Sequence, residues 1–329
     1  MNRKFCIITV VVVLFSTLQA GAQSAATSVF DFLSLPTSSH ATALGGNNLS
    51  LPDDDASLLF LNPALMSDAS DRAIALSFFT YMQGSKAGSA AWTMAHGERG
   101  TWGVGAQFVG YGSMTETTVD GIKQGDFSAL DMALSGGYSY VLTEHLAGGA
   151  AGKFIYSHYG SYSSVALAVD LGLNYYDEEH NFSVSLVGAN LGGQVKAFGD
   201  THETLPYDLR LGLTKQLANA PIRFSFSLVD LTRWKASQYY SPDGDPSGGR
   251  ILTNHFVVGV DILPAKQFYF SAGYNFRRAY ELKAAGAGHG AGLSFGAGLN
   301  VKKFKLGLAY AKYHLSVPSF MITAQYNLR

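Results

Sequence analysis

The sequence has little cysteine, little charge and no long apolar run after its N-terminus. Cys6 is the only cysteine among 329 residues, and it stands at the start of the N-terminal apolar stretch. Disulfide scaffolds and thiolate metal sites are therefore excluded for the remainder. No run of about 18 or more apolar residues occurs beyond the N-terminus, which argues against a helical membrane protein.

Charged residues make up only 14 % of the chain, against roughly 25 % in ordinary soluble domains. The net charge is -1 and no basic cluster occurs, so the composition gives no indication of nucleic-acid binding. Glycine (37), phenylalanine (21) and tyrosine (18) are abundant instead. This profile predicts a body whose outer surface faces something other than water.

Residues 1–22 have the pattern of a secretory signal peptide. Arg3 and Lys4 precede an apolar core at 6–18, and Ala20-Gly21-Ala22 forms a small-residue cleavage site. About 13 apolar residues are too few to span a bilayer. Cys6 stands at the start of the core and not at its end, where a lipidated cysteine would lie, so we expect an exported protein without a lipid anchor.

Alternation of apolar and small or polar residues dominates 72–329. In 163–176, for example, every second residue is apolar: Val165, Leu167, Val169, Leu171 and Leu173. We predict fourteen strands, at 72–80, 84–96, 100–111, 126–142, 145–158, 162–177, 181–190, 206–216, 221–231, 253–263, 266–276, 289–301, 303–312 and 318–328.

The predicted strands are long, and about 9–11 tilted residues suffice to cross a bilayer. Their connections alternate between short and mostly longer ones, as in outer-membrane barrels with short periplasmic turns and long external loops. The sequence therefore predicts an all-β, 14-stranded antiparallel transmembrane β-barrel at 72–329 in the outer membrane, with both termini periplasmic. A soluble or periplasmic β-domain is a weaker alternative.

Six charged residues fall on the less apolar face of their strands, which we expect to line the lumen: Asp131, Lys153, Asp170, Arg210, Arg223 and Asp261. Three of them stand on consecutive predicted strands and are expected to share an ion-pair cluster: Asp131, Lys153 and Asp170. Interior charges are tolerated when they are paired or wet, so a structural role is favoured over a role in transport.

Residues 23–71 interrupt the strand pattern and predict an N-terminal hatch inside the barrel. Breakers and turn-formers concentrate there: Gly45, Gly46, Asp53, Asp54, Asp55, Asn62 and Pro63. The acidic run lacks the alternation and the glycine of a calcium loop. Capping of a helix at 56–61, or pairing with lumenal arginines, explains it better.

Catalytic patterns are absent or misplaced. Gly292 to Gly296 match G-x-S-x-G, but that motif needs a strand-to-helix turn, and Ser294 lies inside an alternating strand. The nine histidines are dispersed without an H-x-x-x-H pair. We therefore expect no enzyme, no cofactor and no metal. Three aromatic residues in the connection 232–253 could anchor a partner protein: Trp234, Tyr239 and Tyr240.

Four segments near the N-terminus resemble the PorQ family of outer-membrane proteins, which belong to the type IX secretion system of Bacteroidetes-type bacteria. They are 28–36 (SVFDFLSLP), 43–46 (ALGG), 53–60 (DDDASLLF) and 62–65 (NPAL). Segments such as 153–157 and 169–179 are similar as well. The pattern of 53–64 is shared more loosely with the wider PorV and fatty-acid-transporter-like (FadL-like) barrels. That resemblance implies fourteen strands and a hatch.

The resemblance further implies a non-catalytic component of the cell-surface attachment complex. Such a barrel would hold a PorZ-like surface protein at the membrane, beside the sortase PorU and the barrel PorV, in contact with lipopolysaccharide. The alternative is a hatch-gated outer-membrane transporter for a hydrophobic small molecule. A lumen filled by 29–71 and crossed by charged pairs would favour the docking scaffold. An apolar lumenal pocket with an opening in the wall would favour the transporter.

Overall fold

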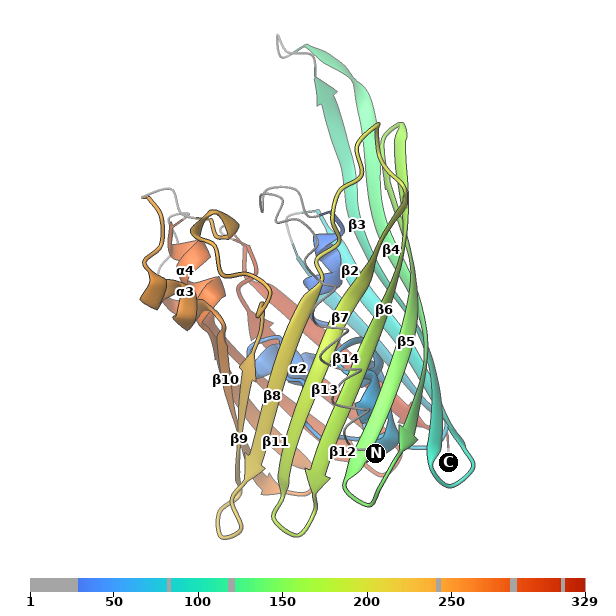
Figure 1. The fold of residues 1–329 in the computed structure, drawn as a ribbon, viewed down its shortest axis with the longest axis vertical. Coiled ribbons are helices and arrows are strands. Elements are labelled where there is room, and N and C mark those ends of the chain that lie inside the picture. The colour runs from blue at the N-terminus through green and yellow to red at the C-terminus, as the bar shows by residue number, and fades with distance from the viewer. Residues whose placement is uncertain are drawn as a thin grey trace, which may run out of the picture.

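The chain folds into a closed antiparallel barrel of fourteen strands, each bonded to its sequence neighbours, with β1 closing on β14 (Figure 1). This computed structural model describes residues 29–81, 84–117, 122–240, 244–284, 289–314 and 317–328. The predicted signal peptide therefore lies outside the described residues. No helix in the described ranges is both long and apolar enough to cross a membrane.

The strands are β1 (Ala73–Thr80), β2 (Lys86–His96), β3 (Gly100–Thr117), β4 (Lys123–Val141), β5 (Leu146–Tyr159), β6 (Tyr162–Asp177), β7 (Phe182–Lys196), β8 (Asp208–Gln216), β9 (Ile222–Leu228), β10 (Phe256–Ala265), β11 (Phe268–Asn275), β12 (Leu293–Val301), β13 (Phe304–Ala311) and β14 (Ser319–Asn327).

Alternation along the strands separates an apolar outside from a small and polar inside. In β6, Leu167 and Leu171 are 53 % and 50 % exposed, whereas Ala168 and Asp170 between them are buried. Successive side chains of a strand point to opposite faces, so the period-2 pattern places one set outward. An outward apolar band of this kind is what a barrel presents to lipid.

The predicted strand number and order are confirmed, and several boundaries differ. The strands β3 and β7 extend beyond their predicted ends at 111 and 190, and β9 ends before its predicted end at 231. Residues expected in strands or loops form α3 (Gly248–Asn254), α4 (Phe276–Ala284) and η5 (His289–Gly292). These short helices carry little local signal, because a helix of one or two turns depends on tertiary packing.

Residues 29–71, called here the plug segment, lie inside the barrel (Figure 1). They form η1 (Asp31–Ser34), α2 (Ser39–Ala43), η2 (Ala56–Phe60) and η3 (Pro63–Asp68), joined by irregular chain. The helix α2 contacts β11 to β14, whereas η2 and η3 contact β1 to β6. Most plug residues from Phe30 to Met66 are buried.

The two ends of the barrel differ in the length of the connections between strands. Short turns and the C-terminal strand end lie at the lower end in Figure 1, and the longer connections lie at the upper end. The upper rim is uneven, because β3 and β4 have 18 and 19 residues whereas β9 has 7. The β3–β4 hairpin rises above its neighbours, and α3 and α4 stand on the low side.

Candidate functional site

Glycines on the inner face of the wall let the plug segment approach the strands closely. Gly149 and Gly172 face the start of η3, and a Cβ at either would overlap Pro63 or Asn62. On the other side of the lumen, a Cβ at Gly273 would overlap the backbone at Leu44 and Gly45. Barrel glycines often mark such close backbone approach.

Two predicted hatch residues shape the end of α2. Gly45 and Gly46 have φ of 105° and 99°, in the left-handed region that glycine adopts readily. Side chains there would also collide with Val257 and Tyr313 of the wall. Their conformation turns the chain away from α2 and toward η2.

His40 of α2 bridges the plug segment and the wall. Its Nδ1 lies 3.1 Å from Asp53 of the plug, and its Nε2 lies 3.0 Å from Asp261 of β10. The imidazole stacks on Tyr269 with ring centroids 4.0 Å apart. Carboxylates only accept hydrogen bonds when ionised, so both ring nitrogens donate and His40 carries a positive charge.

The carboxylate of Asp261 is the centre of this network. Arg223 Nη2 lies 2.8 Å from it, and Ser271 Oγ donates at 2.5 Å. Asp261 is fully buried. A buried charge needs such compensation, because an unpaired one is very costly. Arg223 and Asp261, both expected in the lumen, are therefore paired there, and His40 joins them.

The acidic run of the plug is held by the opposite strands. Lys305 of β13 lies 3.4 Å from Asp53 and 3.3 Å from Asp54. Asp54 also accepts a hydrogen bond from Asn327, at 2.7 Å. Asp55 caps η2 by accepting from the Ser57 amide at 2.8 Å. The expected cap forms, and the cations that pair with the run are Lys305 and His40 where arginines were expected.

The pKa of His40 reflects these neighbours. Burial alone would lower the pKa of His40. The carboxylates of Asp261 and Asp53 outweigh the effect of burial and raise the pKa to about 9. The pKa of Asp53 is lowered by Lys305 and His40 in spite of burial. The site therefore stays ionised at neutral pH and acts as an electrostatic latch, here called the His40 latch (His40, Asp53, Arg223, Asp261 and Lys305).

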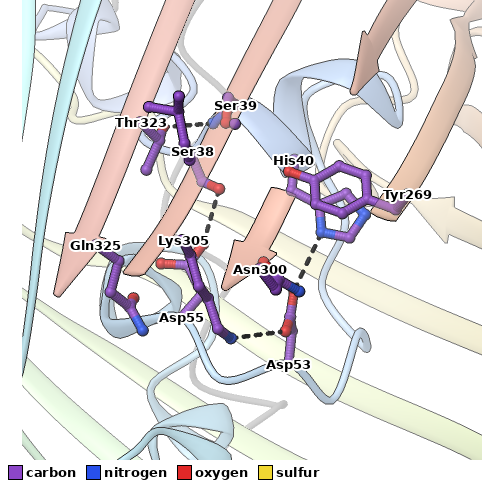
Figure 2. Close-up of a pocket in the computed structure, with 12 residues that line it drawn as sticks. Ser38, Ser39, His40, Asp53, Asp55, Tyr269, Asn300, Lys305, Thr323 and Gln325 are labelled. Carbon is purple, nitrogen blue, oxygen red and sulfur yellow. Dashed lines mark hydrogen bonds and ion pairs between the residues drawn. The ribbon is translucent and has the colours of Figure 1, made fainter. Parts of the chain in front are cut away.

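A small cavity adjoins the latch (Figure 2). It holds about 30 Å³ and is lined by polar groups of the plug and of β11 to β14, among them Ser38, Lys305 and Gln325. That volume has room for about two water molecules and for no larger ligand. Among the described residues, no group of three or more potential metal-ligating side chains is present.

An apolar cluster surrounds η1 in the upper part of the lumen. Around η1, Phe32 and Leu33 pack in one buried cluster with wall residues from β1, β3, β5 and β14, namely Phe79, Val109, Ile155 and Met321. A second cavity of about 20 Å³ lies between η1 and β1 to β3. The connection between β7 and β8 closes over this region, because Leu205 joins the cluster and the Val29 amide donates to the Thr204 carbonyl at 3.2 Å.

Lys153 and Asp170 form a buried ion pair of 2.6 Å. Asn190 accepts from Lys153 at 2.7 Å, and its own amide donates to Asp170 at 2.7 Å. Asn190 has a φ of 54°, at a point where the register of β6 and β7 shifts. The ion pair therefore supports a bulge in the wall.

Asp131 does not join this cluster, contrary to the expected three-residue arrangement. Its carboxylate accepts hydrogen bonds from Tyr111 at 2.7 Å, from Tyr159 at 2.8 Å and from Ser157. Three hydroxyl donors replace the expected lysine. The alternation placed the side chain inward correctly, but the register of β4 and β5 sets Asp131 opposite Ser157, and Lys153 lies four residues further down β5.

Arg210 belongs to a polar group near the upper rim. Its Nε donates to Asp208 at 2.7 Å, and the Asp230 amide donates to the same carboxylate at 2.9 Å. Asp230 in turn pairs with Arg277 of α4 at 2.7 Å. The connection after β9 and the helix after β11 are thereby fixed to the barrel.

The three aromatic residues proposed for partner binding do not form one surface. Trp234 and Tyr240 are 52 % and 57 % exposed. Tyr239 is buried, and its hydroxyl donates to the Arg233 carbonyl at 2.8 Å. The expectation for Tyr239 as a contact residue is therefore wrong, since that side chain packs within its own connection.

Ser294 makes a hydrogen bond to the plug segment and is not placed as a nucleophile. It is buried in β12, and its hydroxyl donates to the Ala43 carbonyl of the plug at 2.9 Å. No strand-to-helix turn follows it. The serine of the G-x-S-x-G match thus helps to hold α2, and no nucleophile elbow is formed.

Comparison with known proteins shows the fold. No family model matches the chain, and no curated protein matches it. Among solved structures, a Pseudomonas aeruginosa FadL homologue aligns with TM-score 0.56 and 12 % identity, covering 89 % of this chain and 98 % of its own. The Pseudomonas putida toluene transporter TodX aligns with TM-score 0.55 and 16 % identity, covering 91 % and 98 %.

A third structure, the CymD monoaromatic hydrocarbon channel, aligns with TM-score 0.54 and 14 % identity, covering 88 % of this chain and 96 % of its own. At these identities the likeness concerns the fold. The chain is a closed 14-stranded antiparallel barrel, and its fold matches that of FadL-like outer-membrane barrels. The narrower resemblance to type IX secretion proteins stays a prediction.

Proposed function

We propose that this protein is an outer-membrane channel for small hydrophobic molecules, closed by its plug segment. The observation that carries the proposal is the apolar cluster around η1, inside a barrel whose fold is similar to that of known hydrocarbon channels. Near the long-connection end, Phe32, Leu33 and Phe79 offer a hydrophobic solute an apolar surface inside the barrel.

Entry requires movement of the connection between β7 and β8 (197–207), called here the lid, which closes over this region. The contacts between plug and lid are few: the Val29–Thr204 hydrogen bond, the packing of Leu205, and Phe198 with its ring centroid 6.3 Å from that of Phe30. Lower down, the His40 latch and the glycine contacts hold α2, η2 and η3. Local opening begins where contacts are fewest, so the lid and η1 are the parts expected to move.

The test is uptake of toluene by cells that lack their own hydrocarbon channels and express this protein. In the variant Val29→Cys/Thr204→Cys, oxidation should lock the lid to the plug segment and abolish uptake, and a reductant should restore it. The matched control is Ser113→Cys/Ser128→Cys, because these residues pair across the β3–β4 hairpin and their disulfide would not join the lid to the plug segment. Uptake no higher than in cells without the protein, or uptake unchanged by the lock, would refute the proposal.

A second candidate is a docking scaffold of a type IX attachment complex, with a PorZ-like surface protein as partner beside PorU and PorV. It is favoured by the filled lumen, where the latch cavity holds only about 30 Å³, and by exposed aromatic residues on the upper rim. Exposed tryptophan and tyrosine commonly anchor protein interfaces.

The scaffold predicts co-purification of a large surface protein from detergent-solubilised outer membranes. Trp234→Ala/Tyr240→Ala should release that partner, whereas Trp102→Ala on the lipid-facing wall should retain it. Because Asp230 and Arg277 tie the connection to the barrel, point substitutions are preferable to replacing 232–253. A partner without toluene uptake would favour the scaffold, and uptake without a partner would favour the channel.

A further inference from the structure

The helices α3 and α4 form an overhang on the low side of the rim. They lie next to each other beyond the upper ends of β9 to β11 (Figure 1). The guanidinium of Arg250 in α3 lies 5.0 Å from the ring centroid of Tyr280 in α4 and joins the two helices. Because β9 has only 7 residues and β11 only 8, the overhang begins where the apolar band of the wall ends.

Exposed apolar side chains continue from the band onto the overhang. Phe256, the first residue of β10, is 36 % exposed, and Leu252 on α3 is 51 % exposed. Trp234 is 52 % exposed and packs on His255 with ring centroids 4.3 Å apart. Tryptophan and leucine in this position are typical of chain that lies at a membrane–water interface.

The same surface carries cations without acidic partners. Arg277 takes up two acids, Asp230 at 2.7 Å and Glu281 at 2.9 Å. The exposed side chains of Lys235, Arg250 and Lys283 form no ion pair within the described residues. Lys283 lies one helical turn beyond Tyr280, on the face of α4 that Arg250 covers.

The charge of the rim differs between its two sides. On the low side, the described residues of 229–256 and 276–283 include six Lys or Arg and three Asp or Glu. On the tall side, the described residues of 111–129, 158–163 and 191–207 together include two Lys or Arg and four Asp or Glu. The low side therefore carries an excess of positive charge that the tall side lacks.

We infer that the overhang binds the phosphate groups of an outer-leaflet lipid, with Lys235, Arg250 and Lys283 contacting the phosphates and Trp234 and Leu252 entering the headgroup region. A phosphorylated glycolipid such as lipopolysaccharide fits both features, because it offers several anionic groups above an acyl layer. Each Lys or Arg near an anionic membrane surface adds to such binding. The inference does not depend on what the lumen conducts.

The test uses the folded protein in detergent, titrated with a bis-phosphorylated glycolipid and observed by native mass spectrometry. Arg250→Glu/Lys283→Glu should weaken lipid binding about tenfold or more. The matched control is Lys86→Glu/Lys123→Glu, which makes the same charge change on other parts of the rim. That variant should bind the lipid like the parent protein.

Two further arms identify the ligand. The same glycolipid without its phosphates should bind the parent protein as weakly as the intact lipid binds Arg250→Glu/Lys283→Glu. Inorganic phosphate should not displace the intact lipid, since it lacks the acyl chains. Equal losses in both double variants, full binding of the dephosphorylated lipid, or displacement by inorganic phosphate would each overturn the inference. Unchanged heat-dependent gel mobility of the variants establishes that the barrels are folded.

Discussion

The two halves of the plug segment are held in the barrel by different forces. The half around α2 meets β9 to β14 through the His40 latch, where five charged side chains compensate one another. The half around η2 and η3 meets β1 to β6 mainly by shape, with apolar side chains and backbone lying against wall glycines. Both halves are buried to a similar degree.

The two halves of the plug segment should therefore respond differently to substitutions. A charge network depends on every partner, because removing one leaves the others buried and uncompensated. Where a contact depends on shape, the change in stability scales with the volume that a substitution adds or removes. Four predictions test this contrast, and all use the free energy of unfolding in lipid vesicles, followed by tryptophan fluorescence in urea.

Asp261→Asn should have the largest effect. The substitution keeps the size of the side chain but leaves His40 and Arg223 without their shared carboxylate. We expect a loss of about 3–5 kcal/mol. As a control, Asp177→Asn removes the partner of His180, whose side chain is 69 % exposed, and should leave stability unchanged. Similar losses in both variants would show that the latch is not a coupled network.

The pH dependence of the latch follows from the raised pKa of His40. Its value of about 9 in the folded protein exceeds the ordinary value near 6.5, so its stabilisation is complete below about pH 6.5. The contribution declines as pH rises and is lost above about pH 9, a change of about 3 kcal/mol. The difference in stability between the parent protein and His40→Gln should therefore shrink from pH 6 to pH 10. A constant difference would contradict this origin.

Gly149→Ala tests the half held by shape. The new Cβ would overlap the backbone at Pro63 and Ala64, which has no room to yield. Overpacking of this kind costs about 1–3 kcal/mol. Gly152→Ala in the same strand is the matched control, since nothing lies within 4 Å of its Cβ. If Gly149→Ala were as stable as the control, the plug would not be packed closely against β5.

Asn62→Ala should have the smallest effect of the four. Asn62 caps η3 by accepting from the Ala64 amide at 3.0 Å, and it donates to the Leu49 carbonyl at 2.9 Å. Loss of such a cap costs about 1 kcal/mol. Asn62→Ser retains a capping oxygen and should recover part of the loss. Recovery would be absent if the cap contributed nothing.

Local pattern was sufficient for much of the fold. The predicted range of β6 equals the observed one, because its alternation runs without interruption between two turns. The cap at Asp55 and the glycine turn after α2 also follow from residues close in sequence. By contrast, α3 and α4 were missed, since neither helix has an apolar period long enough to detect.

Pairing in the lumen was much less predictable. The inward direction of Lys153 and Asp170 followed from alternation, and their pair joins neighbouring strands. The partners of Asp131 turned out to be hydroxyl groups, although a lysine stood on the next strand. His40 gave no local signal, because Asp261 lies 221 residues further along the chain.

The sequence by itself determined the class of structure: an alternating chain with few charges forms a closed barrel with an apolar outside, and a stretch without alternation falls inside it. Alternation acts between adjacent residues, so it is legible in the linear chain. Closure of the barrel decided the rest. It brought His40 to Asp261 and Lys305 to Asp53, pairs whose geometry exists only after strands distant in sequence stand side by side around the lumen.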